Sequence, residues 1–282
     1  MKGSMKINFD FSISGSPARK LVWVTDLHLD FCDELTISSW ISCIKALDPA
    51  GLIITGDISN SKKVEATLLR LADEFRFPIY FIAGNHDCYH GSHAETHQKL
   101  TDLSRGHKYL RFLDQEGVIE LNSTTALIGH SGWADGKAGT GDRSKIIIND
   151  FKYIEELVGG DVCRRRSFLE SWADQAATHF GRLLPEAARS YENIIIVTHV
   201  PPFIEACKHE GKPTDDEYLP HFSSPTAGVP IKEIAKANPE KNFVVLCGHT
   251  HGEGFAQILP NLCVYAGGVK YRYPSWSGTV LF

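Results

Sequence analysis

The sequence has no long hydrophobic run, no excess of basic charge and no paired-cysteine motif. None of its apolar stretches approaches the roughly 18–20 residues of a membrane-spanning helix, so we expect no membrane association. Its 29 lysines and arginines are outnumbered by 34 aspartates and glutamates, for a formal net charge of −5. This balance argues against broad binding to nucleic acids or to acidic membranes.

The seven cysteines form no CxxC pair, and the first residues lack an apolar segment followed by a small-residue cleavage site. These absences predict a reduced, cytoplasmic protein without a signal peptide. The chain also lacks internal repeats, low-complexity tracts and an evident linker. With 282 residues, 43% of them hydrophobic, it can bury a substantial core. We therefore expect a single domain over residues 1–282.

Two kinds of apolar segment alternate in the first third of the chain. Short, nearly continuous apolar runs are typical of strands that are covered on both faces, and they lie at 20–25, 51–55 and 78–83. Helical periodicity lies between them, at 37–47 and 64–75. The order strand, helix, strand, helix, strand predicts right-handed crossovers and a parallel sheet, and hence an α/β protein.

Later segments extend this pattern. They predict, in chain order, a helix, a hairpin or pair of short strands, a long amphipathic helix and two buried strands, at 92–105, 118–133, 168–180, 193–198 and 242–247. Residues 131–160 are rich in glycine and charge and show no clear pattern.

Aspartate, asparagine or histidine follows five of the buried runs, either directly or after a single glycine. The five groups are Asp26 and His28; Asp57; Asn85, His86 and Asp87; His199; and His249 and His251. A single such residue after a strand is usually a turn former or a structural residue. Ligands of open α/β sheets bind at the carboxyl ends of the strands, so we expect these five ends to converge on one site.

The donor atoms in these groups are imidazole nitrogens and carboxylate or amide oxygens, which suit divalent Mn, Fe or Zn. They are too many for one tetrahedral zinc and about right for two divalent metal ions that share a carboxylate. Pairs of ions roughly 3.5–4 Å apart serve in-line displacement at phosphorus. We therefore expect a phosphorylated substrate: a small molecule, a nucleotide or a phosphoprotein.

Taken in order, the motifs resemble those of the calcineurin-like metallophosphoesterase superfamily. The matching elements are D-x-H at 26–28, G-D at 56–57, G-N-H-D at 84–87, H at 199 and G-H-x-H at 248–251. The resemblance covers most of the chain. It implies a four-layer sandwich of two mixed β-sheets flanked by helices.

The resemblance also implies a role for each site residue. Three residues would hold one ion: Asp26, His28 and His251. Three others would hold the second ion: Asn85, His199 and His249. Asp57 would bridge the two ions, and Asp87 would orient its loop or a neighbouring imidazole. His86 would not bind metal but would act on the phosphate as a general acid or as a hydrogen-bond donor.

The function implied is hydrolysis of a phosphate monoester or diester by metal-activated hydroxide, with His86 as the general acid. A cyclic-nucleotide phosphodiesterase fits the same motifs. Related nucleases carry capping domains and basic surfaces that this sequence does not show strongly. A non-catalytic binding scaffold of the same fold lacks the histidine that His86 supplies here.

Two further regions hold candidates for the rim of a substrate pocket. His130 ends a short apolar run, and three polar or aromatic residues follow it: Trp133, Asp135 and Arg143. The long polar loop at 205–225 follows His199 and carries Lys208, His209 and Glu210. Its length is typical of a specificity loop or a lid.

Overall fold

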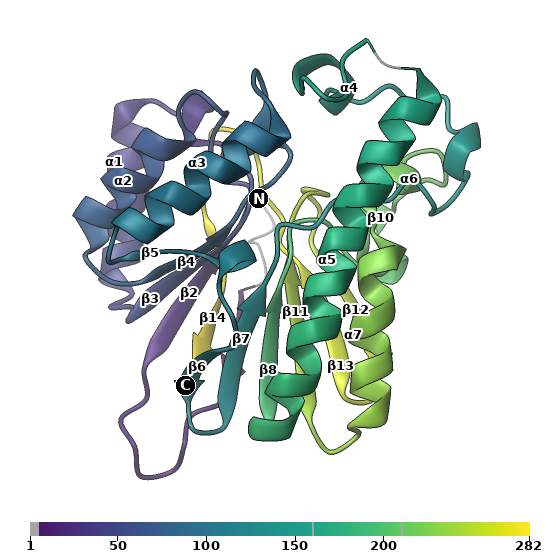
Figure 1. The fold of residues 1–282 in the computed structure, drawn as a ribbon. Helices are drawn as coiled ribbons and strands as arrows, with labels where there is room; N and C mark the ends of the chain where they lie inside the picture. Colours follow the sequence, from purple (N-terminus) through teal and green to yellow (C-terminus); the bar gives the residue numbers. More distant parts are fainter. Residues whose placement is uncertain (1–5, 160, 210) are drawn as a thin grey trace.

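The computed structural model of the protein describes residues 6–159, 161–209 and 211–282, and its centre is a pair of six-stranded sheets (Figure 1). The first sheet consists, in spatial order, of β1 (Ile7–Asp10), β14 (Trp276–Leu281), β2 (Lys20–Val24), β3 (Gly51–Thr55), β4 (Ile79–Ile82) and β5 (Leu110–Phe112). The second consists of β12 (Gly254–Leu259), β13 (Leu262–Ala266), β11 (Asn242–Cys247), β8 (Asn193–Val197), β7 (Thr125–Gly129) and β6 (Ile119–Asn122).

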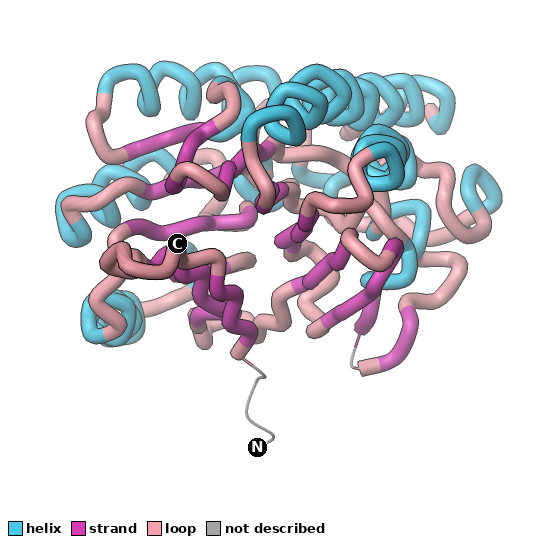
Figure 2. Tube along the Cα trace, turned by 90° about the horizontal axis from the view of Figure 1, so that it is seen from below, coloured by secondary structure: helices cyan, strands magenta, loops and turns pink. Residues whose placement is uncertain are grey.

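Helices cover the outer face of each sheet. The first sheet packs against α1 (Glu34–Ala46), α2 (Val64–Phe75) and α3 (His93–Gly106), and the second against α5 (Val162–Ser190) and α7 (Pro225–Ala237). Figure 2 shows the strands in the middle of the molecule and the helices mostly at its outside. The resulting order of layers, helix, sheet, sheet and helix, confirms the predicted sandwich.

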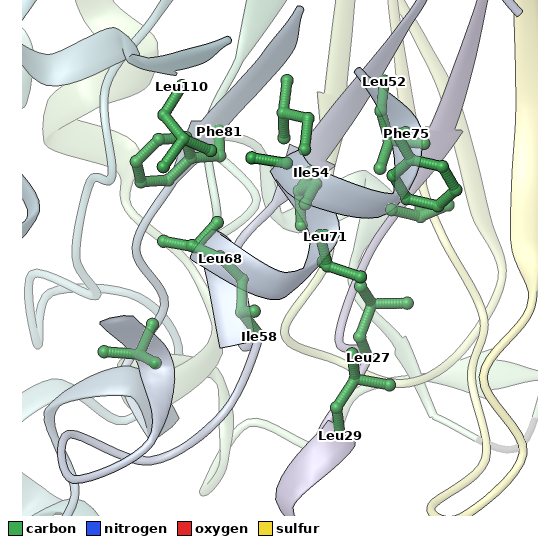
Figure 3. Close-up of a cluster of buried hydrophobic side chains, with 14 of the residues drawn as sticks. Leu27, Leu29, Leu52, Ile54, Ile58, Leu68, Leu71, Phe75, Phe81 and Leu110 are labelled. Carbon is green, nitrogen blue, oxygen red and sulfur yellow. The ribbon is translucent and has the colours of Figure 1, made fainter. Parts of the chain in front are cut away.

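The strands of the first sheet alternate between two cores. On β2, Val22 and Val24 pack against the helices, whereas Leu21 and Trp23 point toward the second sheet. This is the two-residue period of a strand whose faces are both buried, and it explains the continuous apolar runs in the sequence. Figure 3 shows the helix-facing core, in which residues of α2 such as Leu68 and Leu71 lie close to Ile54 of β3.

The direction of the strands determines where the polar motifs lie. β2, β3 and β4 are parallel neighbours in the first sheet, and β8 and β11 are parallel neighbours in the second. The carboxyl ends of parallel strands share one edge, so the residues that follow each group of strands are brought together there.

Three parts of the fold were not predictable from the pattern. The helix α7 contains Pro225, Gly228 and Pro230, which interrupt its helical signal. In the described part of the segment at 131–160, residues 131–159, the helices are only short turns, including α4 (Asp150–Tyr153). The polar loop at 205–225 forms a small hairpin of β9 (Lys208–His209) and β10 (Lys212–Pro213), followed by α6 (Leu219–Phe222). None of the helices in the described ranges is both long and apolar enough to cross a membrane.

Two glycines in the neighbouring helices α5 and α7 provide a matched test of this packing. A Cβ at Gly228 would overlap the carbonyl oxygen of Pro202, whereas a Cβ at Gly181 would lie 3.9 Å from Pro230 Cβ, an ordinary contact. We expect Gly228→Ala to lower the free energy of unfolding by about 1–3 kcal/mol, because the backbone must shift. Gly181→Ala should raise it by about 0.5–1 kcal/mol, because alanine is the better helix former. Urea denaturation of both variants measures the difference, and equal effects would contradict the close packing at Gly228.

Candidate metal centre and active site

Five of the motif residues have left-handed backbone conformations. The φ angles are 46° at Asp26, 43° at His28, 54° at Asp57, 69° at His249 and 56° at His251. This region is uncommon for residues other than glycine, and such strained positions concentrate at functional sites. The sharp turns after β2, β3 and β11 aim these side chains across the edge of the sheets.

Four side chains form a first pocket of metal-binding atoms. One ligand atom from each of Asp26, His28, Asp57 and His251 lies within 4.8 Å of the others. Nε2 of His28 is 3.5 Å from Oδ2 of Asp57 and 3.2 Å from Nε2 of His251. Nε2 of His251 is 3.4 Å from Oδ1 of Asp26. These four atoms converge on the space that one cation would fill.

A second pocket lies on the other side of Asp57. Its members are Asn85, His199 and His249, together with the second carboxylate oxygen of Asp57. Oδ1 of Asn85 lies 3.1 Å from Nε2 of His199 and 2.9 Å from Nδ1 of His249. Nε2 of His199 is 3.4 Å from Oδ1 of Asp57. Asp57 thus presents one oxygen to each pocket, which is the arrangement expected of a bridging residue.

Hydrogen bonds outside the pockets orient these imidazoles. Nδ1 of His199 lies 2.7 Å from the carbonyl oxygen of Thr55, and Nε2 of His249 lies 2.9 Å from that of His221. Because a carbonyl can only accept, each of these nitrogens carries the proton. The other nitrogen of each ring therefore presents a lone pair to the second pocket.

Asp87 connects two of the motif loops. Its Oδ1 accepts hydrogen bonds of 2.9 Å from the backbone N–H groups of Ile58 and Ser59, and its Oδ2 accepts one of 2.8 Å from Gly84. It therefore ties the loop after β3 to the loop after β4. Of the two roles predicted for Asp87, these contacts correspond to the orientation of a loop.

Burial sets the charge of the two pockets. It lowers the pKa of His28 to about 3 and that of His249 to about 4, so both rings are neutral near pH 7, the form that binds metal. Burial, and next the charge of Asp26, raise the pKa of Asp57 well above its ordinary value. Without a cation the ionised form of this carboxyl is therefore disfavoured, because its negative charge would be buried among neutral imidazoles without compensation. The donor set and this charge fit two divalent cations, one in each pocket.

His86 lies next to the first pocket without joining it. Its ring centroid is 4.5 Å from that of His28, and its Nε2 is 3.4 Å from Oδ2 of Asp30. Burial alone would raise the pKa of Asp30, but its contact with His86 results in a lowered pKa. Sequence reasoning missed Asp30. The available signal was its position two residues after His28, in D-x-H-x-D.

Comparisons with known proteins agree with this geometry. The family model of the calcineurin-like phosphoesterases matches residues 19–253. The chain belongs to the calcineurin-like phosphoesterase family. This membership makes it a metal-dependent phosphoric ester hydrolase. A search of curated proteins gave no match.

Solved structures resemble the phosphoesterase in fold. One is a phosphopantetheinyl hydrolase from Mycobacterium tuberculosis, with a TM-score of 0.65 and 12% identity over 90% of each chain. Another is a dimetal phosphatase from Danio rerio, with a TM-score of 0.58 and 10% identity over 90% of this chain and 88% of that one. Identities this low establish the shared fold and no more.

A cavity of about 330 Å³ opens onto both pockets of the phosphoesterase. Its polar floor includes Asp57, Asn85 and His86, and much of its wall is apolar or aromatic. The wall residues include Ile147, Tyr218, Phe222 and Tyr271. Sequence reasoning missed these residues because they lie outside regular elements with a clear pattern. Ile147 lies in the stretch at 131–160, Tyr218 and Phe222 lie in the loop at 205–225, and Tyr271 lies between β13 and β14.

The residues predicted to form the substrate rim lie in different places. His209 lines the cavity of the phosphoesterase, as expected of a rim residue. His130 instead lines a separate cavity beside α5 and lies 3.7 Å from Asp114. Trp133 is 4% exposed and packs edge-on against Trp172 in the core. The structure therefore corrects the rim prediction for His130 and Trp133, because apolar packing and a buried carboxylate hold them elsewhere.

The other candidates also differ from the prediction. Asp135 is buried and accepts hydrogen bonds of 2.8 Å from the N–H groups of Lys137 and Thr226, so it supports the chain at the start of α7. Arg143 is exposed at the end of a short turn, outside the set of described residues that line the cavity. Lys208 is half-buried in β9 and likewise outside that set. Glu210 lies outside the described residues.

The position of Asp57 between the pockets leads to a test. An asparagine in its place would keep the shape of the side chain and tolerate the φ angle of 54°, but the charge and the second oxygen donor would be lost. We expect Asp57→Asn to lower the affinity of both pockets for their ions. The loss should exceed the ~10–100-fold that follows when a residue that only hydrogen-bonds to a ligand is removed. His251→Ala should lower the affinity of the first pocket only. Elemental analysis and calorimetric titration with Mn²⁺ measure this, and an Asp57→Asn protein that holds two ions at wild-type affinity would disprove the bridge.

Proposed function

We propose that this phosphoesterase hydrolyses a phosphate monoester or diester of a small organic molecule, with His86 as the general acid. The observation that carries the proposal is that both metal pockets and His86 face one cavity. When bound, two divalent ions would polarise the phosphoryl oxygens and lower the pKa of a water molecule between them. The remaining steps fall to side chains of the chain itself.

His86 is placed to move one proton. Nε2 lies 3.4 Å from Oδ2 of Asp30, and because an ionised carboxylate only accepts, the ring is oriented with its Nε2 proton directed at Asp30. Nδ1 then remains to give its proton to the leaving oxygen. The attacking water loses one proton to solvent as its oxygen bonds to phosphorus, the ester P–O bond breaks, and the leaving oxygen takes the Nδ1 proton and departs as an alcohol. Neutral His86 keeps the proton that faces Asp30.

The walls of the cavity support an organic group next to the phosphate. Residues 146–148 contribute three isoleucines in a row, and Phe222 and Tyr218 form a second wall. The described lining residues include no lysine or arginine, so charge recognition rests on the two cations. Apolar walls hold an aliphatic or aromatic group better than a chain of further phosphates. A nucleoside base has this character.

A second cavity favours a diester. It has a volume of about 530 Å³ and shares His86, Tyr89, Asn149 and Tyr271 with the first. Asp30, Phe31 and Arg272 are among its other lining residues. A phosphoryl group between the two cavities would have room for one ester arm on each side. The leaving alcohol would be the one beside Nδ1 of His86, the ring nitrogen that does not face Asp30.

A panel of substrates tests the proposed function. The protein reconstituted with Mn²⁺, Fe²⁺ or Zn²⁺ is assayed with a monoester, a linear diester, a cyclic nucleotide and a phosphoprotein. The proposal predicts turnover of small esters, with the linear diester or the cyclic nucleotide favoured over the monoester. Turnover of the phosphoprotein alone would contradict it.

The role of His86 depends on how much the leaving oxygen needs a proton. An alkoxide needs one, so His86→Ala should slow an alkyl ester by about 10²–10⁴-fold. A p-nitrophenolate leaves without needing a proton, so the rate on the p-nitrophenyl ester should fall much less. The metal content should stay at two ions per chain. Asp30→Asn should also slow the alkyl ester more than the aryl ester, with a smaller loss on each than His86→Ala. The measurement is a pair of rate constants on matched aryl and alkyl esters, and equal losses on both would show that His86 acts by binding phosphoryl oxygens instead.

A further inference from the structure

The second pocket depends on which way the side-chain amide of Asn85 points. Only the amide oxygen can bind a cation, because the NH₂ group is a donor without a free lone pair. The two ends of the amide have nearly the same shape, so steric packing does not choose between them. In the structure, Oδ1 faces His199 and His249, and Nδ2 faces away from the pocket.

Asp150 lies on the far side of this amide. Nδ2 of Asn85 donates to Oδ1 of Asp150 over 2.8 Å, and the hydroxyl of Tyr89 donates to the same oxygen over 2.7 Å. Nδ2 also lies 3.1 Å from the hydroxyl oxygen of Tyr89. The three groups form a closed ring of hydrogen bonds, and Asp150 is only 4% exposed.

This ring favours one orientation of the amide. An ionised carboxylate accepts and cannot donate, and the proton of Tyr89 is already directed to Asp150. A rotated Asn85 would place its own oxygen against two acceptor oxygens inside the protein, where such a contact is costly. It would also turn toward the second pocket an NH₂ group, which can donate to the nitrogen lone pairs of His199 and His249 but cannot bind a cation.

We propose that Asp150 is a positioning residue that fixes Asn85 with its oxygen in the second pocket and so sets the affinity of that pocket for its ion. This inference rests on the proposed function and deepens it. Asp150 is the first residue of α4 and closely follows the isoleucines that wall the cavity. The segment at 146–150 therefore shapes the cavity and completes the metal centre at the same time.

The test uses three variants of the full chain and titration with Mn²⁺. Asp150→Ala removes the acceptor of the Asn85 amide. It should lower the affinity of the second pocket for Mn²⁺ by about 10–100-fold, the usual effect of removing a residue that hydrogen-bonds to a metal ligand. The first ion, held by Asp26, His28 and His251, should bind as in the wild type. Asp150→Asn keeps one acceptor oxygen and should rescue most of the loss. Asp135→Ala removes another buried carboxylate of the same region, whose partners are backbone N–H groups, and should leave both ions unchanged.

Electron paramagnetic resonance supplies a second readout that stability alone would not change. Two Mn²⁺ ions that share Asp57 are magnetically coupled, whereas a lone ion gives the sharp signal of isolated Mn²⁺. At a concentration of Mn²⁺ that just saturates the wild type, Asp150→Ala should show the isolated signal and about one ion per chain. Asp150→Asn and Asp135→Ala should show the coupled one.

The outcomes separate this inference from the proposed function. Unchanged second-ion affinity in Asp150→Ala, in a protein that hydrolyses esters, overturns the role of Asp150 alone. A loss in Asp150→Asn as large as in Asp150→Ala also overturns it, because charge and not hydrogen bonding would then be decisive. A wild type that holds two coupled ions but hydrolyses none of the esters refutes the proposed function. If Asp150→Ala loses its second ion in that case, the role of Asp150 still holds. A wild type that binds fewer than two ions overturns both.

Discussion

The carboxylate of Asp57 is the point on which the site depends. It lies between two groups of donors, and its oxygens face opposite ways, toward Nε2 of His28 and toward Nε2 of His199. It is 3% exposed, so its charge is removed from water, at a considerable cost in free energy unless cations compensate. The fold tolerates this cost because the same burial keeps the neighbouring imidazoles neutral and ready to bind metal. Two divalent ions resolve both constraints together.

Close approach of backbone to side chain makes the arrangement possible. A Cβ at Gly84 would overlap Oδ1 of Asp57, and a Cβ at Gly248 would overlap Oδ2 of Asp26. The glycines of the G-N-H-D and G-H-x-H motifs are thus explained by contact distances within this structure. The left-handed turns at the ligand residues show the same crowding. The strands on either side are deeply buried, and their packing holds these strained turns in place.

The sequence predicted the parts of the site that follow regular strands. A buried strand leaves a clear signal, and a polar residue directly after it must lie at the edge of the sheet, so Asp26, Asp57 and His199 could be placed without a structure. Asp150 and the carbonyl of His221 could not be placed, because they come from irregular segments without hydrophobic periodicity. His130 also follows a strand, but β7 lies farther from the pockets, beyond β8 in the second sheet. Trp133 was misplaced because an aromatic side chain near a motif packs in a core as readily as it lines a pocket.

The central claim is that the two sheets meet to form a dinuclear metal centre bridged by Asp57. Crystals of the Mn²⁺-loaded protein, measured at the manganese absorption edge, test it most directly through anomalous scattering. The account predicts two anomalous peaks roughly 3.5–4 Å apart, with one oxygen of Asp57 toward each and Oδ1 of Asn85 toward the second. A single four-coordinate ion, with His199 and His249 turned away from it, would contradict the account.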